Sequence, residues 1–185
     1  MILSIDTTFD FGSIALTQGH EVVEEVSLHE PEGFGHVLFG HIAGLIEKHR
    51  TAIHEMDCFA AASGPGSFTG VRVGLAAVKG LAEATGKRVV AVSNLRALAS
   101  FGSAPLRAAV IDARRGEVYA AAYNDRLEIV IPEVVIKFDD WLPMLPKNYE
   151  LISTVDAPRP LAAAIGRIAW EDFLAGHSSD PAAID

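Results

Sequence analysis

The sequence predicts an α/β protein in which mixed sheets are flanked by helices. Extended segments open the chain, and strands then alternate with amphipathic helices up to about residue 101. Half of the 185 residues are hydrophobic and 21% are charged, which provides enough apolar surface for a packed core. A strand, turn and strand pattern in the second half repeats the start of the chain, and this favours two related lobes.

The first part of the chain is expected to form an antiparallel meander. Its extended segments span 1–6, 12–17 and 21–28, and a turn around Gly19 joins the last two. Helices and strands then alternate. The expected elements are a helix at 34–49, a strand at 57–62, a helix at 71–84, a strand at 88–92 and a short helix at 94–101. Gly86 is expected to end the second helix.

The second half of the chain carries a weaker pattern. It predicts strands at 107–112 and 117–123, and then a helical turn at 139–142 between two short apolar segments at 129–136 and 149–154. A last helix is expected from about 160 to 174. The two lobes are expected to cover 1–102 and 103–185, and the second lobe is short and ends in a loose polar tail.

Charge and composition exclude several classes of protein. With 24 acidic and 15 basic side chains the net charge is −9, so the chain alone lacks the basic surface that grips nucleic acid. No apolar run approaches the roughly 20 residues of a membrane span, and the start has no basic leader, so a cytoplasmic location is expected. The single cysteine, Cys58, lies in an apolar stretch that is typical of a buried thiol rather than a nucleophile.

Asp6, Thr7 and Thr8 follow the first extended segment. In some nucleotide-binding folds a carboxylate at this place faces metal-bound phosphate, while hydroxyls and turn amides hold the phosphate oxygens. The same residue types also cap turns through side-chain to backbone hydrogen bonds, and spacing alone favours this role. If two lobes closed on ATP, Asp112 at the end of the repeated strand would join Asp6 and Thr8 around magnesium phosphate.

Three glycines lie in the loop 64–70, which leads into a helix N-terminus that would favour an anion. The loop lacks the Gly-Lys-Ser/Thr ending of a Walker A motif and the third glycine of a dinucleotide-binding fingerprint. It also lacks the glycine that a nucleophile elbow requires two residues before its serine. The alternative is a tight strand-to-helix connection in which Ser67 or Thr69 caps the helix.

Gly70, Gly74 and Ala77 share one face of the helix after this loop. Small side chains there let another backbone approach closely, either that of the protein's own sheet or that of a partner's helix. The histidines do not form a metal motif: His36 and His41 are five residues apart, which separates them by roughly 140° around a helix. No metal site is therefore expected, which speaks against a metallopeptidase.

Three segments together resemble the TsaB (formerly YeaZ) family: 2–8, the stretch 64–74 with its Gly-Pro-Gly-Ser-Phe-Thr-Gly-x-Arg sequence, and 111–119. The resemblance implies an actin-like fold of two lobes, as in sugar kinases and the Hsp70 ATPase, each with a five-stranded sheet. It also implies a non-catalytic scaffold subunit, without a cofactor, in the bacterial formation of N6-threonylcarbamoyladenosine at position 37 of tRNA. The implied partners are the catalytic TsaD paralogue and the TsaE ATPase, with tRNA reached only through the complex.

On this resemblance, the helices at 34–49 and 71–84 form the face that docks on TsaD, and in isolation the same face would favour a homodimer. The docking candidates are His36, Leu38, Ile42, Leu45, Gly70, Arg72, Val73, Gly74 and Ala77. The candidates for a vestigial phosphate site are Asp6, Thr7, Thr8 and Asp112. No residue is expected to be catalytic. Two alternatives stay open, an actin-like ATP-binding phosphotransferase or ATPase and, less favoured, a metallopeptidase.

Overall fold

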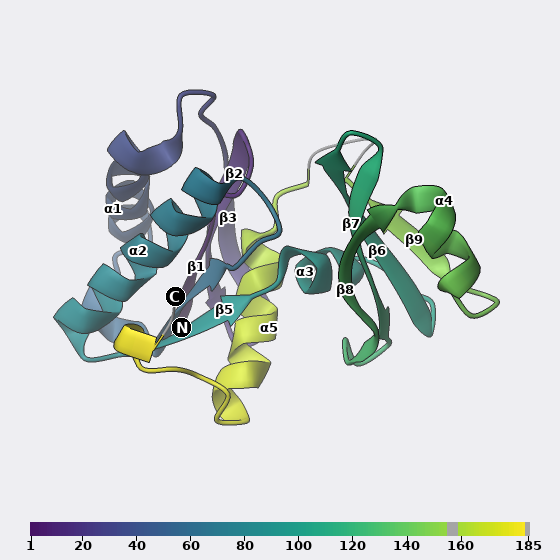
Figure 1. The fold of residues 1–185 in the computed structure, drawn as a ribbon. Coiled ribbons are helices and arrows are strands. Elements are labelled where there is room, and N and C mark those ends of the chain that lie inside the picture. The colour runs from purple at the N-terminus through teal and green to yellow at the C-terminus, as the bar shows by residue number, and fades with distance from the viewer. Residues whose placement is uncertain (155–158, 184–185) are drawn as a thin grey trace. The chain divides into compact units, whose positions relative to one another are not determined.

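The computed structural model describes residues 1–154 and 159–183, which form two compact units (Figure 1). The first unit combines Met1–Val92 with Pro160–Asp185, and the second is Ser93–Arg159. The expected division at residue 102 is therefore corrected. The last helix does not complete the second lobe, because its apolar face packs on the first sheet.

A five-stranded sheet forms the centre of the first unit, in the order β3-β2-β1-β4-β5. Its strands are β1 (Ile2–Asp6), β2 (Phe11–Gln18), β3 (Glu21–His29), β4 (Cys58–Ala62) and β5 (Arg88–Val92). The first three strands pair antiparallel, as the meander predicts, whereas β4 and β5 run parallel to β1. The expected strands of this unit are thus confirmed.

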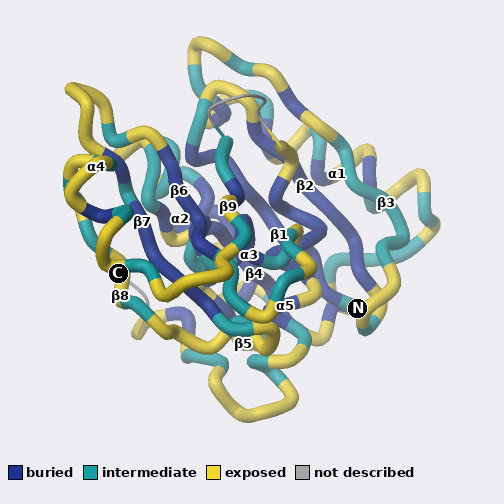
Figure 2. Tube along the Cα trace, turned by 90° about the vertical axis from the view of Figure 1, so that its right-hand side faces the viewer, coloured by how far each residue is buried: buried dark blue, intermediate teal, exposed yellow. Residues whose placement is uncertain are grey.

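Helices cover both faces of this sheet (Figure 1). The short helix η1 (Phe34–His36), α1 (Leu38–Lys48) and α2 (Phe68–Thr85) cover one face, and α5 (Ala162–Leu174) covers the other. The turn η2 (Ile53–Glu55) precedes β4. Because side chains alternate along a strand, Leu3 and Ile5 of β1 pack into the α1 and α2 core while Ser4 between them meets α5. Figure 2 shows β1 and β2 buried along most of their length.

Residues of β1 and β2 hold the start of α5. The hydroxyl of Ser13 accepts hydrogen bonds from the backbone N–H groups of Leu161 (3.2 Å) and Ala162 (3.0 Å). Ser4 donates to the carbonyl oxygen of Ala162 at 2.7 Å. A helix leaves its first N–H groups without acceptors inside the helix. Here the hydroxyl of a serine from a distant strand is the acceptor for two of them. These bonds return the end of the chain to the first unit.

Helix α2 begins three residues earlier than the periodicity predicts. Ser67 is its N-cap, and its hydroxyl accepts from the N–H of Gly70 at 3.3 Å. This confirms one of the two caps expected from the sequence. The helix ends as predicted at Gly86, which has the left-handed φ of 67° that glycine adopts readily.

A four-stranded sheet, in the order β8-β7-β6-β9, forms the second unit. Its elements are α3 (Asn94–Ala99), β6 (Leu106–Arg114), β7 (Glu117–Asn124), β8 (Ile129–Lys137), α4 (Phe138–Trp141), η3 (Leu142–Met144) and β9 (Glu150–Ser153). On one face Trp141 packs fully buried against Val110, Val118 and Ala120, while α3 contacts the sheet through β6, β7 and β9. The resemblance implies five strands here, but the described residues form four.

The two sheets share one topology. In the first, β1 lies between an antiparallel β2 and a parallel β4, and in the second, β6 lies between an antiparallel β7 and a parallel β9. A further antiparallel strand, β3 or β8, follows at the same side. The internal repeat that the sequence suggests is therefore confirmed.

The segment after α5 is more ordered than the expected loose tail. Ser179 and Val89 exchange two backbone hydrogen bonds, of 2.8 and 3.0 Å, and so extend the sheet beyond β5. The short helix η4 (Pro181–Ala183) follows, with Pro181 buried. Residues 184–185 of the predicted tail lie outside the described residues.

Candidate functional site

The turn after β1 contains the predicted phosphate-binding residues Asp6, Thr7 and Thr8, and all three are buried. One carboxylate oxygen of Asp6 accepts from the N–H of Thr8 at 3.0 Å and from the Thr8 hydroxyl at 2.6 Å. A carboxylate that accepts from a backbone N–H two residues later closes an Asx turn. The structure thus bears out the turn-capping alternative for Asp6.

Asp112 occupies the corresponding place in the second unit. It stands near the end of β6, is exposed, and accepts from the N–H of Arg114 at 2.8 Å. The topological repeat therefore extends to this turn: in each unit the aspartate accepts from the backbone N–H of the residue two positions later. Asp6 and Asp112 each have a structural role within their own unit.

The glycine-rich loop packs directly on the Asp6–Thr8 turn. The Thr7 hydroxyl donates to the carbonyl oxygen of Gly70 at 2.7 Å. The N–H of Ser67 donates to the carbonyl oxygen of Thr8, also at 2.7 Å. A Cβ atom at Gly66 would stand 2.6 Å from the Cβ of Thr8, and one at Gly70 would collide with the Thr7 carbonyl oxygen. The close approach that Gly66 and Gly70 permit is therefore used by the protein's own turn.

The small-residue face of α2 is turned toward the protein's own sheet. A Cβ added to Gly74 would lie 2.8 Å from the Thr7 hydroxyl and 3.8 Å from Ile5, and Ala77 is buried in the same core. This corrects the expectation that Gly70, Gly74 and Ala77 receive a partner's helix.

The docking candidates on α1 are corrected for the same reason. Leu38, Ile42 and Leu45 are all buried in the core that α1 forms with the sheet. An amphipathic helix turns its apolar stripe toward the core, and the helical spacing that revealed these residues is the spacing of that stripe.

Exposed aromatic residues stand instead near the starts of the two helices. Phe39 on α1 is 55% exposed and Phe68 on α2 is 70% exposed, and the Arg72 guanidinium lies 3.6 Å above the Phe68 ring centroid. Of the remaining candidates, His36 is exposed and Val73 is partly exposed. We call His36, Phe39, Phe68 and Arg72 the aromatic surface. Neither phenylalanine could be found from helical spacing, because each falls outside the buried stripe of its helix.

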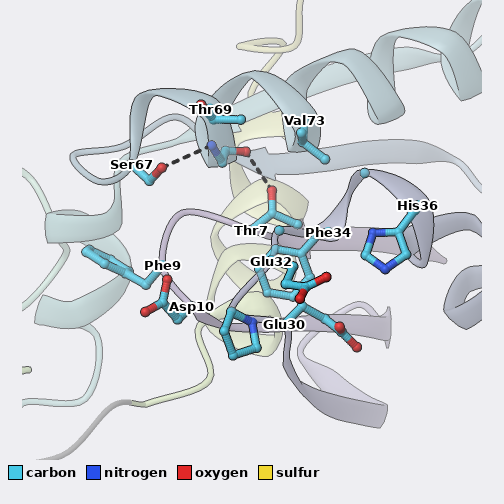
Figure 3. Close-up of a pocket in the computed structure, with 14 residues that line it drawn as sticks. Thr7, Phe9, Asp10, Glu30, Glu32, Phe34, His36, Ser67, Thr69 and Val73 are labelled. Carbon is cyan, nitrogen blue, oxygen red and sulfur yellow. Dashed lines mark hydrogen bonds between the residues drawn. The ribbon is translucent and has the colours of Figure 1, made fainter.

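A cavity of about 430 Å³ lies beside this surface, between the β1–β2 turn, the start of α2 and the segment from β3 to η1 (Figure 3). Its lining includes the carboxylates of Asp10, Glu30 and Glu32, which sequence reasoning did not single out. Within the described chain, no cluster of three or more histidine, cysteine or acidic side chains is arranged to hold a metal ion. Nor is any described helix long and apolar enough to span a membrane.

Cys58 is fully buried in β4, and this burial raises the pKa of its thiol to about 12. A thiol is nucleophilic only as the thiolate, so Cys58 stays protonated and unreactive at neutral pH. The expectation of a structural cysteine is confirmed.

Comparison with known proteins places these features in a family. The family model described as "TsaD: tRNA N6-adenosine threonylcarbamoyltransferase" matches residues 36–175. TsaB of Bacillus subtilis is 34% identical over 152 residues, which cover 80% of this chain and 66% of the relative. TsaB of Escherichia coli is 34% identical over 127 residues, which cover 66% of this chain and 54% of the relative. The chain thus spans between about half and two thirds of the length of these curated relatives.

Solved structures show the same fold. YeaZ from Pseudomonas aeruginosa superimposes with a TM-score of 0.79 at 24% identity, covering 98% of this chain and 96% of that one. A second structure, described as similar to peptidase YEAZ from Pseudomonas aeruginosa, reaches 0.82 at 23% identity, covering 99% and 96%. The expected α/β fold, with mixed sheets and helices in two related units, is confirmed.

Proposed function

The chain belongs to the TsaB (YeaZ) family, within the wider family that the TsaD model describes, and from this membership we propose that it is a non-catalytic subunit in the formation of N6-threonylcarbamoyladenosine on tRNA. Its task is to dock on and support the catalytic TsaD protein. The names of its relatives support the process, and the geometry of the first unit supports the role within it.

The observation that carries the non-catalytic role is the packing of the glycine-rich loop on the turn after β1. Catalysis of phosphoryl transfer requires donors aimed at the transferred group, together with bound metal ions. Here the Thr7 hydroxyl is engaged by Gly70, and the turn after β1 lies against the loop. The loop connects β4 to α2 and holds the start of α2 against the turn after β1.

The docking role falls on the aromatic surface. Aromatic and arginine side chains are enriched at the energetic centres of protein interfaces, and large apolar rings left in water favour association. Phe39 and Phe68 start two helices on the same face of the first sheet (Figure 1). The net charge of −9 supports a further part of the proposal, that tRNA is held by the partner and not by this chain. We assign the TsaE ATPase as a second partner and, in isolation, a homodimer through the same surface.

Alanine substitutions test the docking role. Phe68→Ala and Phe39→Ala should each weaken binding to TsaD about tenfold or more, measured by calorimetry, and should lower tRNA modification in the reconstituted reaction. Melting temperatures should stay close to that of the wild-type protein, because neither ring is buried. The matched control is Ile129→Ala, which removes a 61% exposed side chain from the second unit.

Two results would contradict the proposal. If both phenylalanine variants bind TsaD as the wild-type protein does, the docking surface lies elsewhere. If the isolated protein binds magnesium ATP with micromolar affinity, and a folded Asp6→Ala variant loses that affinity, the ATP-binding alternative replaces the non-catalytic role.

A further inference from the structure

The cavity beside the aromatic surface carries an unbalanced negative charge. Asp10, Glu30 and Glu32 line it, whereas no lysine or arginine does. The side chains of Asp10 and Glu32 form no hydrogen bond or ion pair with any residue that the structure describes. Glu30 has only a distant imidazole neighbour, His41, at 3.9 Å. Carboxylates gathered in a concave site repel anions and attract a cation.

The walls of the cavity combine polar side chains with aromatic and aliphatic ones, which limits the kind of cation. Phe34, which is buried, contributes to the lining together with Phe9, Pro31 and Val73. Figure 3 shows Asp10 and Glu32 on the side opposite Ser67 and Thr69 of the α2 start, with Thr7 between them. The volume of about 430 Å³ lies at the lower end of the range of about 300–1,000 Å³ that is usual for small-ligand sites.

This combination fits an arginine side chain better than a metal ion or an ammonium group. A metal needs three or more converging ligands, and the described residues provide no such cluster. A guanidinium is planar, is weakly hydrated, stacks on aromatic rings and can donate to two carboxylates at once. Arg72, the arginine of α2, lies over the Phe68 ring and does not line the cavity, so it does not neutralise these carboxylates.

We propose that this cavity binds the guanidinium group of an arginine carried by the protein that docks on the aromatic surface. Ser67 and Thr69, which flank Phe68 in the chain, line the cavity together with His36, so the cavity adjoins the aromatic surface. The inference rests on the proposed function for the identity of the partner, and on the cavity itself for the chemistry of the bound group.

A small-molecule titration tests the chemistry without the partner. N-acetyl-arginine methylamide is added to the ¹⁵N-labelled protein, with the citrulline analogue as an uncharged ligand of the same shape. The arginine compound should shift the amide resonances of Gly33, Gly35 and Gly70 in a saturable way, with a dissociation constant in the millimolar range. This constant should be at least about fivefold lower than that of the citrulline compound. The double variant Asp10→Asn, Glu32→Gln should remove this difference. Equal binding of both compounds, or shifts unchanged in the variant, would overturn the proposal.

A second measurement tests the partner. The same double variant should bind TsaD about threefold to tenfold more weakly and with less dependence on salt, whereas the control Asp125→Asn, exposed in the second unit, should bind normally. If wild-type and double variant bind TsaD equally, the cavity is not part of the docking site and the proposal fails while the proposed function stands. If the wild-type protein does not bind TsaD at all, the proposed function fails and the partner assignment with it.

Discussion

Two glycines of α2 show how differently the same residue can act within one helix. At Gly70 a Cβ atom would collide with the carbonyl oxygen of Thr7, so the absence of a side chain lets α2 pack on the turn after β1. At Gly80 the same atom would meet nothing within 4 Å, and the residue is exposed. Packing therefore explains the first glycine, and nothing in the structure explains the second.

Substituting each glycine by alanine should change stability in opposite directions. Gly70→Ala should lower the free energy of unfolding by about 1–3 kcal/mol, because backbone must shift to admit the methyl group. Gly80→Ala should raise it by about 0.5–1 kcal/mol, because alanine loses less backbone entropy in a helix. Urea denaturation of both variants measures the two effects. A neutral Gly70→Ala would mean that the loop and turn can separate at little cost.

At the scale of whole elements, the position of α5 depends on side chains of strands far away in the sequence. Ser13 of β2 accepts from two N–H groups at the helix start, and Glu25 of β3 accepts from the N–H of Ala163 at 2.8 Å. The residue at the N-cap position, Leu161, has no side chain that could do this. A sequence pattern predicts the helix but not its anchor, because the capping serine is almost 150 residues away.

Ser13→Ala should therefore destabilise the first unit by about 1–3 kcal/mol, since it leaves buried N–H groups without an acceptor. Ser27→Ala is the matched control. Ser27 pairs with Ser13 across the β2–β3 register but is exposed, so its replacement should change stability by less than about 0.5 kcal/mol. Thermal and urea unfolding of the two variants provide the comparison, and similar losses from both would show that the remote cap contributes nothing.

Periodicity identified α1 and α2 correctly, but many of the residues that it selected as docking candidates lie on the buried faces of these helices. Leu38, Ile42 and Leu45 were recognised because they recur at helical spacing, and recurrence at that spacing marks the buried face. Exposed residues such as Phe68 do not need to follow any period. The acidic residues of the cavity were also unpredictable, because Asp10 and Glu32 become neighbours of the α2 start only through the folded sheet.

At the scale of the whole molecule, the first unit buries the thiol of Cys58 and the second unit buries the phenol of Tyr123. Burial raises the pKa of Cys58 in the first unit to about 12. In the second unit, burial and then the adjacent Glu133 carboxylate raise the pKa of Tyr123 above its ordinary value of 10.0. Between their ordinary and raised pKa values, both groups hold a proton in the folded state that the unfolded chain releases.

Alkaline pH should therefore destabilise the protein. Stability from Cys58 is complete below pH 9 and falls as the pH rises toward 12, by at most about 1.4 kcal/mol per pH unit. Urea midpoints at pH 7.5, 9.0 and 10.0 should decline for the wild-type protein. Cys58→Ala should show a lower midpoint at neutral pH but a flatter decline above pH 9. Equal slopes for the two proteins would exclude a role for the thiol.

The fold could be anticipated further than the site. Order and type of the strands, the repeat and the glycine stop of α2 all depend on local patterns, which a sequence displays directly. The unit boundary could not be read in this way. It depends on α5 crossing back to Ser4 and Ser13, and no local pattern states which sheet a helix will cover.

That return crossing has a consequence for synthesis. The ribosome delivers Met1–Val92 before α5, so the face of β1 and β2 that α5 covers stays bare until Ala162–Leu174 has left the exit tunnel. Ser93–Arg159, whose contacts lie within one uninterrupted stretch, has by then emerged completely. The unit that is translated first is thus the last to be completed, and during elongation its uncovered strands are a surface that a nascent-chain chaperone can shield.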